Sequence, residues 1–231
     1  MSDCCDRPGY HNVFSDRFAR RIARTYRKRG LSRIQLRMVS FLTERGIEDA
    51  SVLEIGGGVG ELQLELLYRG ARAVTNLEIS SGYEAEAARL LEDSGMAARV
   101  TRRLLDIASS PEEVEPADVV VLHRVVCCYP DYERLLSAAA SHAKRLLVFS
   151  HPPRSLFTRA VLSLENLLHR LRNSDFRAFV HPPAAMINVA EADGLSVSYR
   201  HSGLSWHVVG LERSTHGISG ASSGVNGEQS K

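Results

Sequence analysis

Glycines 56, 58 and 60 lie in the stretch of residues 52–61. A short apolar segment precedes them and a Leu-rich segment follows them. Glycine is needed where the backbone takes unusual angles and where a ligand must approach the main chain closely. In an open parallel sheet, the ligand crevice lies beyond the carboxyl ends of the strands. A glycine-rich turn that follows a strand and precedes a helix therefore predicts a ligand site at that edge of a sheet.

Two kinds of phosphate site are excluded by the residues after this turn. The dinucleotide fingerprint Gly-x-Gly-x-x-Gly needs a third glycine. A motif that starts at Gly56 has Glu61 at that position, and a motif that starts at Gly58 has Gln63. No Gly-Lys-Ser/Thr follows, so the turn is not a P-loop. A carboxylate at the start of a helix would also repel a pyrophosphate.

The pattern Glu-x-Gly-x-Gly-x-Gly resembles the glycine motif of class I S-adenosylmethionine-dependent methyltransferases, and the resemblance covers about residues 48–213. It implies S-adenosyl-L-methionine as cofactor, with Glu54 receiving the amino group of its methionine part. Glu78 would bind the two ribose hydroxyls, and Asp106 would accept from the adenine amino group. The alternative for each acid is a solvated strand end or a helix cap. The implied cofactor-binding residues are Glu54, Gly56, Gly57, Gly58, Gly60, Glu78, Ile79, Asp106, Ile107 and His123.

Candidates for the acceptor side follow the fourth and fifth predicted strands. His123 and His151 are the titratable groups placed to act as a base, since an unperturbed imidazole titrates near 6.5. His123 is alternatively a residue that only lines the cofactor pocket, and His151 a turn residue. Arg124 is a candidate for holding an acceptor carboxylate; the alternatives are an ion pair with Asp131 and a surface role.

Tyr129 and Pro130 continue this segment, which is similar to the corresponding Ile-His-Tyr-Pro stretch of magnesium-protoporphyrin O-methyltransferases. Cys127-Cys128 replaces Ile-His, a departure that argues against a porphyrin acceptor. The segment lacks the Asn/Asp-Pro-Pro-Tyr/Phe of enzymes that methylate base amino groups. We therefore expect an enzyme that methylates oxygen or carbon of a small organic acceptor, anionic and largely apolar, with Arg124 and Tyr129 in substrate binding.

Two alternatives remain open. Residues 1–45 carry 11 Lys/Arg and 4 Asp/Glu, whereas the rest carries 18 and 23, so a basic N-terminal part could serve an RNA methyltransferase. We nevertheless do not expect nucleic acid as a partner. The other alternative is a non-catalytic S-adenosylmethionine-binding protein, and an ordinary solvated helix face also explains the charge.

Four cysteines form two adjacent pairs, Cys4-Cys5 and Cys127-Cys128. Consecutive side chains of a strand face opposite ways, which is poor geometry for a tetrahedral zinc site, so no metal is expected. The N-terminus has no signal-peptide pattern, and no run of 18 apolar residues exists. These features predict reduced thiols and a cytoplasmic protein.

Alternating strands and helices must position these groups. The patterns predict a Rossmann-like, doubly wound α/β fold, with a mostly parallel seven-stranded sheet and an antiparallel last strand. The predicted strands are 51–55, 73–79, 100–105, 117–122, 145–149, 195–200 and 204–211.

Three regions are expected: a helical N-terminal flap (1–46), a methyltransferase domain (47–213) and a disordered tail (214–231). Tyr10 and Tyr26 are similar to aromatic residues that such flaps fold over the cofactor; core packing is the alternative. Residues 154–172 are expected to form an amphipathic helix, within an insertion (154–183) that caps the carboxyl edge of the sheet, packs on its face, or does both. Peripheral membrane contact of this helix is a further expectation.

Overall fold

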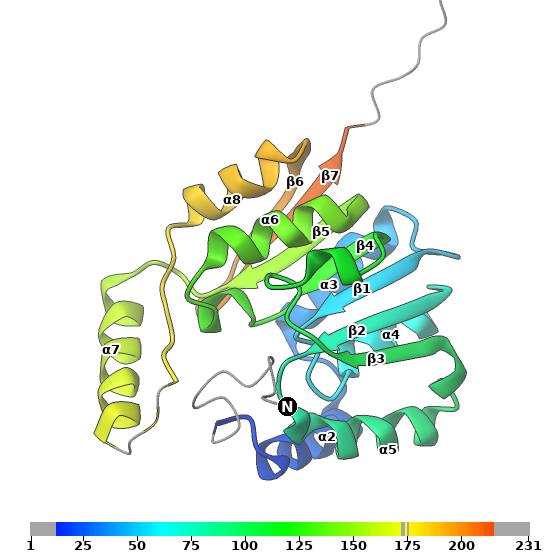
Figure 1. Ribbon diagram of the computed structural model, residues 1–231, viewed down its shortest axis with the longest axis horizontal. Coiled ribbons are helices and arrows are strands. Elements are labelled where there is room, and N and C mark those ends of the chain that lie inside the picture. The colour runs from blue at the N-terminus through cyan, green and yellow to red at the C-terminus, as the bar shows by residue number, and fades with distance from the viewer. Residues whose placement is uncertain (1–12, 172–173, 175, 215–231) are drawn as a thin grey trace, which may run out of the picture.

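Seven strands form one sheet in the order β3-β2-β1-β4-β5-β7-β6 (Figure 1). The computed structural model describes residues 13–171, 174 and 176–214; the Cys4-Cys5 pair, Tyr10 and nearly all of the predicted tail lie outside these residues. β7 runs antiparallel to both of its neighbours, and every other neighbouring pair is parallel. The strands are β1 (Ser51–Ile55), β2 (Ala73–Glu78), β3 (Val100–Leu104), β4 (Ala117–Leu122), β5 (Ala143–His151), β6 (Leu195–Ser202) and β7 (His207–Arg213).

Both faces of the sheet are buried, which is why its central strands are almost wholly apolar. Val119 and Val121 of β4 face one cluster with α3 and α4, while Val120 and Leu122 face another with α6 and α8. The helices around the sheet are α3 (Arg33–Glu44), α4 (Glu61–Tyr68), α5 (Glu84–Ser94), α6 (Tyr132–His142) and α8 (Pro183–Ala192). The predicted fold class is therefore confirmed.

The N-terminal helix α2 (Asp16–Arg29) packs against α5 and the turn after β2 through Ala19 and Ala23, which are fully buried. Gly30 ends it with a φ of 69°, and Ser32 begins α3 with a capping box to Gln35. This junction fixes the direction in which α2 leaves the sheet. As a result α2 stands beside the carboxyl ends of β1 and β2 rather than over the sheet face.

The insertion between β5 and β6 differs from one of the two expectations. Helix α7 (Leu156–Leu171) contains no buried residue, so the interpretation of a helix packed on the sheet face is wrong. In Figure 1, α7 stands apart from the rest of the fold. The face of the sheet is covered instead by α8, which the sequence analysis did not predict; its Met186, Ile187 and Ala190 are buried there.

Candidate active site

The turn after β1 is built from glycines because neither its backbone nor its surroundings accept side chains. Gly56, Gly58 and Gly60 all have positive φ angles, between 57° and 86°. A Cβ on Gly57 would lie 2.6 Å from Oε2 of Glu54 and would also overlap Asn76. The backbone therefore passes directly over a carboxylate, with no room for a side chain between them.

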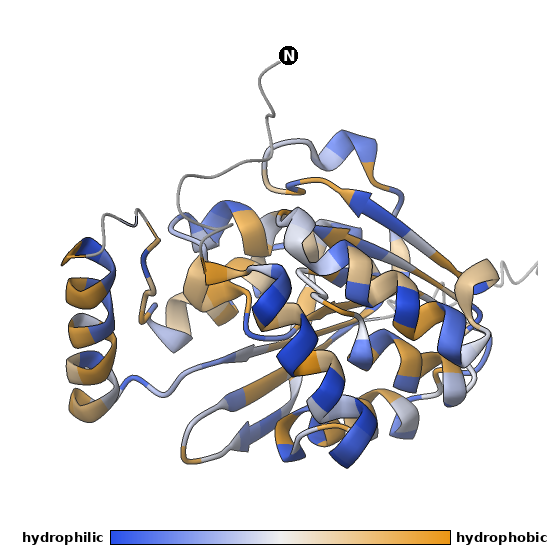
Figure 2. Cartoon of the chain, turned by 90° about the horizontal axis from the view of Figure 1, so that it is seen from below, coloured by the Kyte–Doolittle hydropathy of each residue, from blue (hydrophilic) through white to orange (hydrophobic). Residues whose placement is uncertain are grey.

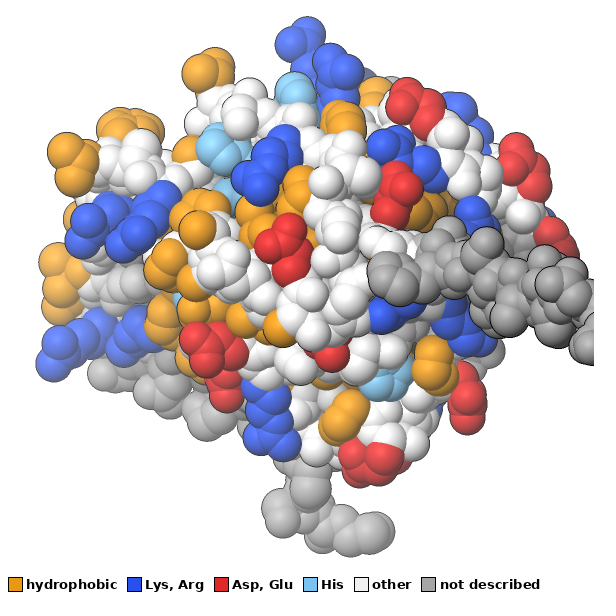
Figure 3. All heavy atoms as spheres, turned by 90° about the horizontal axis from the view of Figure 1, so that it is seen from above, with side chains coloured by type: hydrophobic (Ala, Val, Ile, Leu, Met, Phe, Trp, Pro, Cys, Tyr) orange, Lys and Arg blue, Asp and Glu red, His pale blue; other side chains and the backbone are white. Residues whose placement is uncertain are grey.

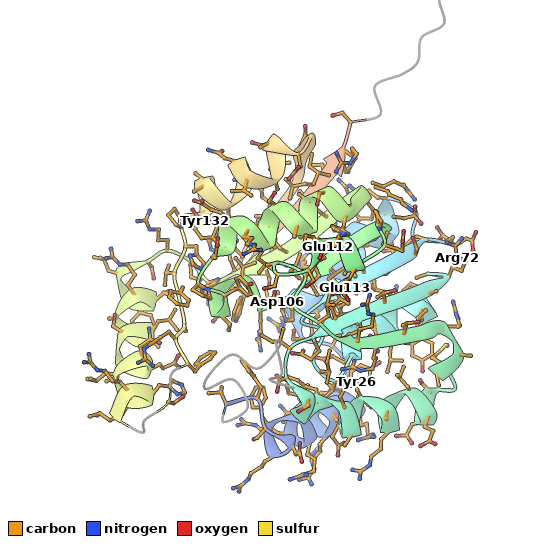
Figure 4. All side chains as sticks on the ribbon, viewed as in Figure 1. Tyr26, Arg72, Asp106, Glu112, Glu113 and Tyr132 are labelled. Carbon is orange, nitrogen blue, oxygen red and sulfur yellow. The ribbon has the colours of Figure 1, made fainter. Side chains whose placement is uncertain are left out.

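A cavity of about 1070 Å³ opens above this turn. Its floor is the turn and the start of α4, its walls are the segments that follow β2 and β4, and its roof is residues 14–35. The apolar stripe of the N-terminal helix, including Phe18, Ile22 and Tyr26, lines the cavity, and Ile22 and Tyr26 also pack against a buried core cluster. Figure 4 labels Tyr26 beside α2 and Asp106 nearer the centre of the molecule.

Glu54 lies at the bottom of the cavity and is only 2% exposed. The Asn76 amide donates to Glu54 at 3.0 Å and to Gln63 at 2.8 Å. Burial, and then the nearby Glu61, raises the pKa of Glu54 to about 8. Burial also raises the pKa of Glu61, whose carboxyl group accepts from Gln35 at 2.9 Å. A cation in the cavity would favour the ionised form of both carboxyl groups.

Glu78 ends β2 and fixes the turn from the other side. Its two oxygens accept backbone N–H groups of Gly58 at 3.0 Å, Ile79 at 2.8 Å and Ser80 at 3.0 Å. Burial raises its pKa, while these hydrogen bonds oppose the shift. The carboxylate is therefore held in one orientation beside the glycines, and it lines the same cavity as Glu54.

The end of β4 contributes His123 and Arg124 to the cavity wall. Ser150 of β5 holds both, since its hydroxyl lies 3.0 Å from His123 Nδ1 and accepts from the Arg124 N–H at 3.0 Å. Arg124 has a φ of 60°, uncommon for a residue with a side chain, and its guanidinium lies 4.9 Å from the Trp206 ring centroid. Burial, and then Arg124, lowers the pKa of His123 to about 3, so this imidazole is neutral at physiological pH.

Of four other predicted residues, one lines the cavity and three do not. Tyr129 lines the cavity and donates its hydroxyl to Asp106 at 2.9 Å. Asp106 and Ile107 are buried and are not among the described residues that line the cavity. His151 is 3% exposed and also outside that lining, with Nδ1 2.9 Å from the Pro152 carbonyl oxygen.

The alternative partner for Arg124 is not observed. Asp131 begins α6, and its carboxylate accepts from the Arg134 N–H at 3.0 Å. Among the described residues, no ion pair joins it to Arg124. The guanidinium of Arg124 instead contributes to the cavity wall.

The two central cysteines differ in their surroundings. Cys127 is buried, and its Sγ lies 3.6 Å from Sγ of Cys128, which lines the cavity. In the described part of the chain, no group of three or more His, Cys, Asp or Glu side chains is arranged to hold a metal ion.

Several cavity residues were missed in the sequence analysis. Tyr83 is 6% exposed and forms part of the wall, and Arg21, Arg29 and Arg33 belong to the roof. The positive charge of residues 1–45 was the available signal for the arginines. Trp206, the single tryptophan, carried no pattern that placed it beside Arg124.

Comparison with known proteins identifies the family of the chain. A family model described as "Methyltransferase domain" matches residues 18–217. The chain belongs to this methyltransferase family. A search of curated proteins finds no significant match.

Solved structures agree with the family at the level of the fold. Magnesium protoporphyrin IX methyltransferase from Synechocystis PCC 6803, with bound SAH, is 22% identical with a TM-score of 0.69, covering 88% of this chain and 98% of that one. An O-methyltransferase family protein from Burkholderia thailandensis is 20% identical with a TM-score of 0.65, covering 89% and 64%. The predicted class, an S-adenosylmethionine-dependent methyltransferase with a Rossmann-like fold, is thus confirmed. Among the described residues, no helix has the length and apolar character to cross a bilayer.

Proposed function

We propose that the cavity binds S-adenosyl-L-methionine and that the enzyme transfers its methyl group to a small organic acceptor. The observation that carries this proposal is the joint placement of Glu54, Glu78 and the glycine turn in one cavity. A buried carboxyl group suits a cationic amine, and a fixed carboxylate with two oxygens suits a pair of hydroxyls. Glu54 would bind the amine of the methionine part and Glu78 the ribose.

For the adenine end, we keep Asp106 and Ile107 as the proposed contacts, with Ile79 of the cavity wall beside them. The N–H of Leu105, one residue before Asp106, donates to the Glu78 carbonyl oxygen at 2.9 Å. This bond joins the loop after β3 to the end of β2, which supports the proposal. The Tyr129 hydroxyl donates to Asp106, and Tyr129 itself is part of the cavity lining.

The acceptor side of the cavity combines apolar and cationic groups. Phe14, Phe18 and Val125 supply apolar surface, and Arg124 supplies a guanidinium. Arg21, Arg29 and Arg33 of the roof add positive charge. This environment supports an acceptor with an anionic group and an apolar body, methylated at oxygen or carbon, with Arg124 and Tyr129 in contact with it.

Methyl transfer is an in-line displacement at a sulfonium carbon, so the protein must above all align donor and acceptor. His123, neutral and held by Ser150, is the proposed acceptor of a proton from the substrate. Its low pKa makes it a weak base, which suits an acceptor whose proton is acidic. His151 is proposed only as a second candidate, because it does not line the cavity.

The test is calorimetric titration with S-adenosylhomocysteine. The wild-type protein should bind it, and Glu78→Ala should bind it about 10- to 100-fold more weakly, as expected for loss of a charged hydrogen-bond partner. Glu92→Gln, a change of an exposed acid on α5, is the control and should bind as the wild type does. No binding by the wild type, or equal binding by Glu78→Ala, would refute the carboxylate assignment.

A further inference from the structure

Helix α7 exposes its entire apolar face. Leu156 is 83% exposed, Phe157 78% and Leu171 71%. Residues three, four and seven apart lie on the same side of a helix, and the exposed apolar residues follow that spacing. The exposed apolar residues of α7 are Leu156, Phe157, Val161, Leu164, Leu167, Leu168 and Leu171.

Contacts on the opposite side of α7 join it to the segment that follows it in the chain. The Asn166 side chain donates to the Ala178 carbonyl oxygen and accepts from the Ala178 N–H, both at 2.8 Å. The Ser174 N–H donates to the His169 carbonyl oxygen at 2.9 Å, and the His169 ring lies 5.2 Å from that of Phe176. These contacts turn one side of α7 toward Ser174, Phe176 and Ala178, and the exposed apolar residues lie on the other side.

Positive charge accompanies this face. Residues 154–177 contain five arginines and two acids, Glu165 and Asp175, a net charge of +3. Arg154, Arg159 and Arg170 are exposed. Figure 3 shows hydrophobic side chains and basic side chains together along the left edge, where α7 lies, and Figure 2 shows the hydrophobic and hydrophilic sides of this helix.

We propose that α7 is an interfacial helix that binds the surface of an anionic lipid bilayer. Leucine and phenylalanine on one face with arginines beside it is the composition of helices that lie in the headgroup region. Each arginine near such a surface adds attraction to anionic lipid, and the +3 charge of residues 154–177 complements it. With 16 residues, α7 is about 24 Å long and lies on the surface rather than crossing it.

A second copy of the chain fits the apolar face of α7 less well than a bilayer does. A helix of this length and about 10–12 Å in width offers a footprint of roughly 250–300 Å². Stable protein interfaces bury about 800 Å² on each partner. Pairing two α7 helices would also bring together two segments of equal positive charge.

Co-sedimentation of the full chain with lipid vesicles tests the proposal. The protein should sediment with vesicles that contain about 30% phosphatidylserine, and less with pure phosphatidylcholine. Leu164→Asp combined with Leu168→Asp should lower the partition coefficient at least about tenfold, because charges would replace two apolar contacts. Arg159→Glu combined with Arg170→Glu should weaken binding to the anionic vesicles and leave pure phosphatidylcholine unaffected.

Leu204→Asp is the matched control, since Leu204 is a fully exposed leucine that is not part of α7 but of the β6–β7 turn. It should sediment as the wild type does. Binding of S-adenosylhomocysteine, measured on every variant, reports folding separately from lipid binding and tests the cofactor site independently. Wild-type protein that stays in the supernatant, or equal sedimentation of the Leu164/Leu168 double variant, would overturn the proposal. A wild-type dimer in sedimentation equilibrium that this variant abolishes would assign the face to a second copy instead.

Discussion

Glu54→Gln should stabilise the ligand-free protein while weakening its cofactor site. Burial raises the pKa of Glu54 from its ordinary 4.5 to about 8. Between these values the folded protein keeps a proton that the unfolded chain releases, so stability falls as pH rises. At pH 7 the cost is about 3 kcal/mol, and above pH 8 it levels off at about 5 kcal/mol.

Glutamine keeps the shape of the side chain and an oxygen that can accept from Asn76, but it does not ionise. At pH 7 we therefore expect the unfolding temperature to rise by about 6–12 °C, at about 2–4 °C for each kcal/mol in a protein of this size. Affinity for S-adenosylhomocysteine should fall, because the partner of the amine is lost.

Thermal unfolding without ligand measures this at several pH values. The difference between variant and wild type should nearly vanish below pH 4.5 and grow toward pH 8. Glu92→Gln should change stability by less than about 0.5 kcal/mol at each pH. A Glu54→Gln protein as stable as the wild type at pH 8, or less stable, would refute the assignment of a buried carboxyl group that resists ionisation.

Three further predictions concern the same site. Gly57→Ala should destabilise the protein by about 1–3 kcal/mol and reduce S-adenosylhomocysteine binding in calorimetry, because its Cβ would meet Glu54; unchanged binding would contradict the close packing. Ser150→Ala should lower the free energy of unfolding in urea by about 1–2 kcal/mol, since its hydroxyl holds both His123 and Arg124; no loss would show that these bonds contribute nothing. The pKa of His123, lowered to about 3, should keep its imidazole neutral from about pH 5 to pH 8, so NMR of this ring should show no titration there, and a midpoint near 6.5 would disprove its burial.

The sheet and its glycine turn were accessible from the sequence because each is encoded locally. The predicted bounds of β1 and β4 coincide with the structure, since a short and mostly apolar run marks each strand. β7 was placed three residues too early, at Leu204 instead of His207. Apolar character alone does not separate the last residues of a turn from the first of a strand.

Contacts between residues far apart in the sequence could not be predicted in the same way. Residues 154–172 have the pattern of an ordinary amphipathic helix, and the contacts of Asn166 and His169 with the segment after α7 join residues that no local pattern pairs. Helix α8 was missed, although it begins at Pro183 and proline suits the first turn of a helix. The pairing of Trp206 with Arg124 joins residues far apart in sequence, which no local pattern reveals.

The order of the strands also governs when the cavity can assemble as the chain leaves the ribosome. β1 pairs with β2 on one side, but its other neighbour, β4, is synthesised much later. Ser150, which positions His123 and Arg124, follows later still, and Trp206 comes with the last hairpin. A nascent chain that stops before β7 therefore presents β5 with an unpaired, apolar edge. Chaperones bind such edges, and misfolded chains associate through them.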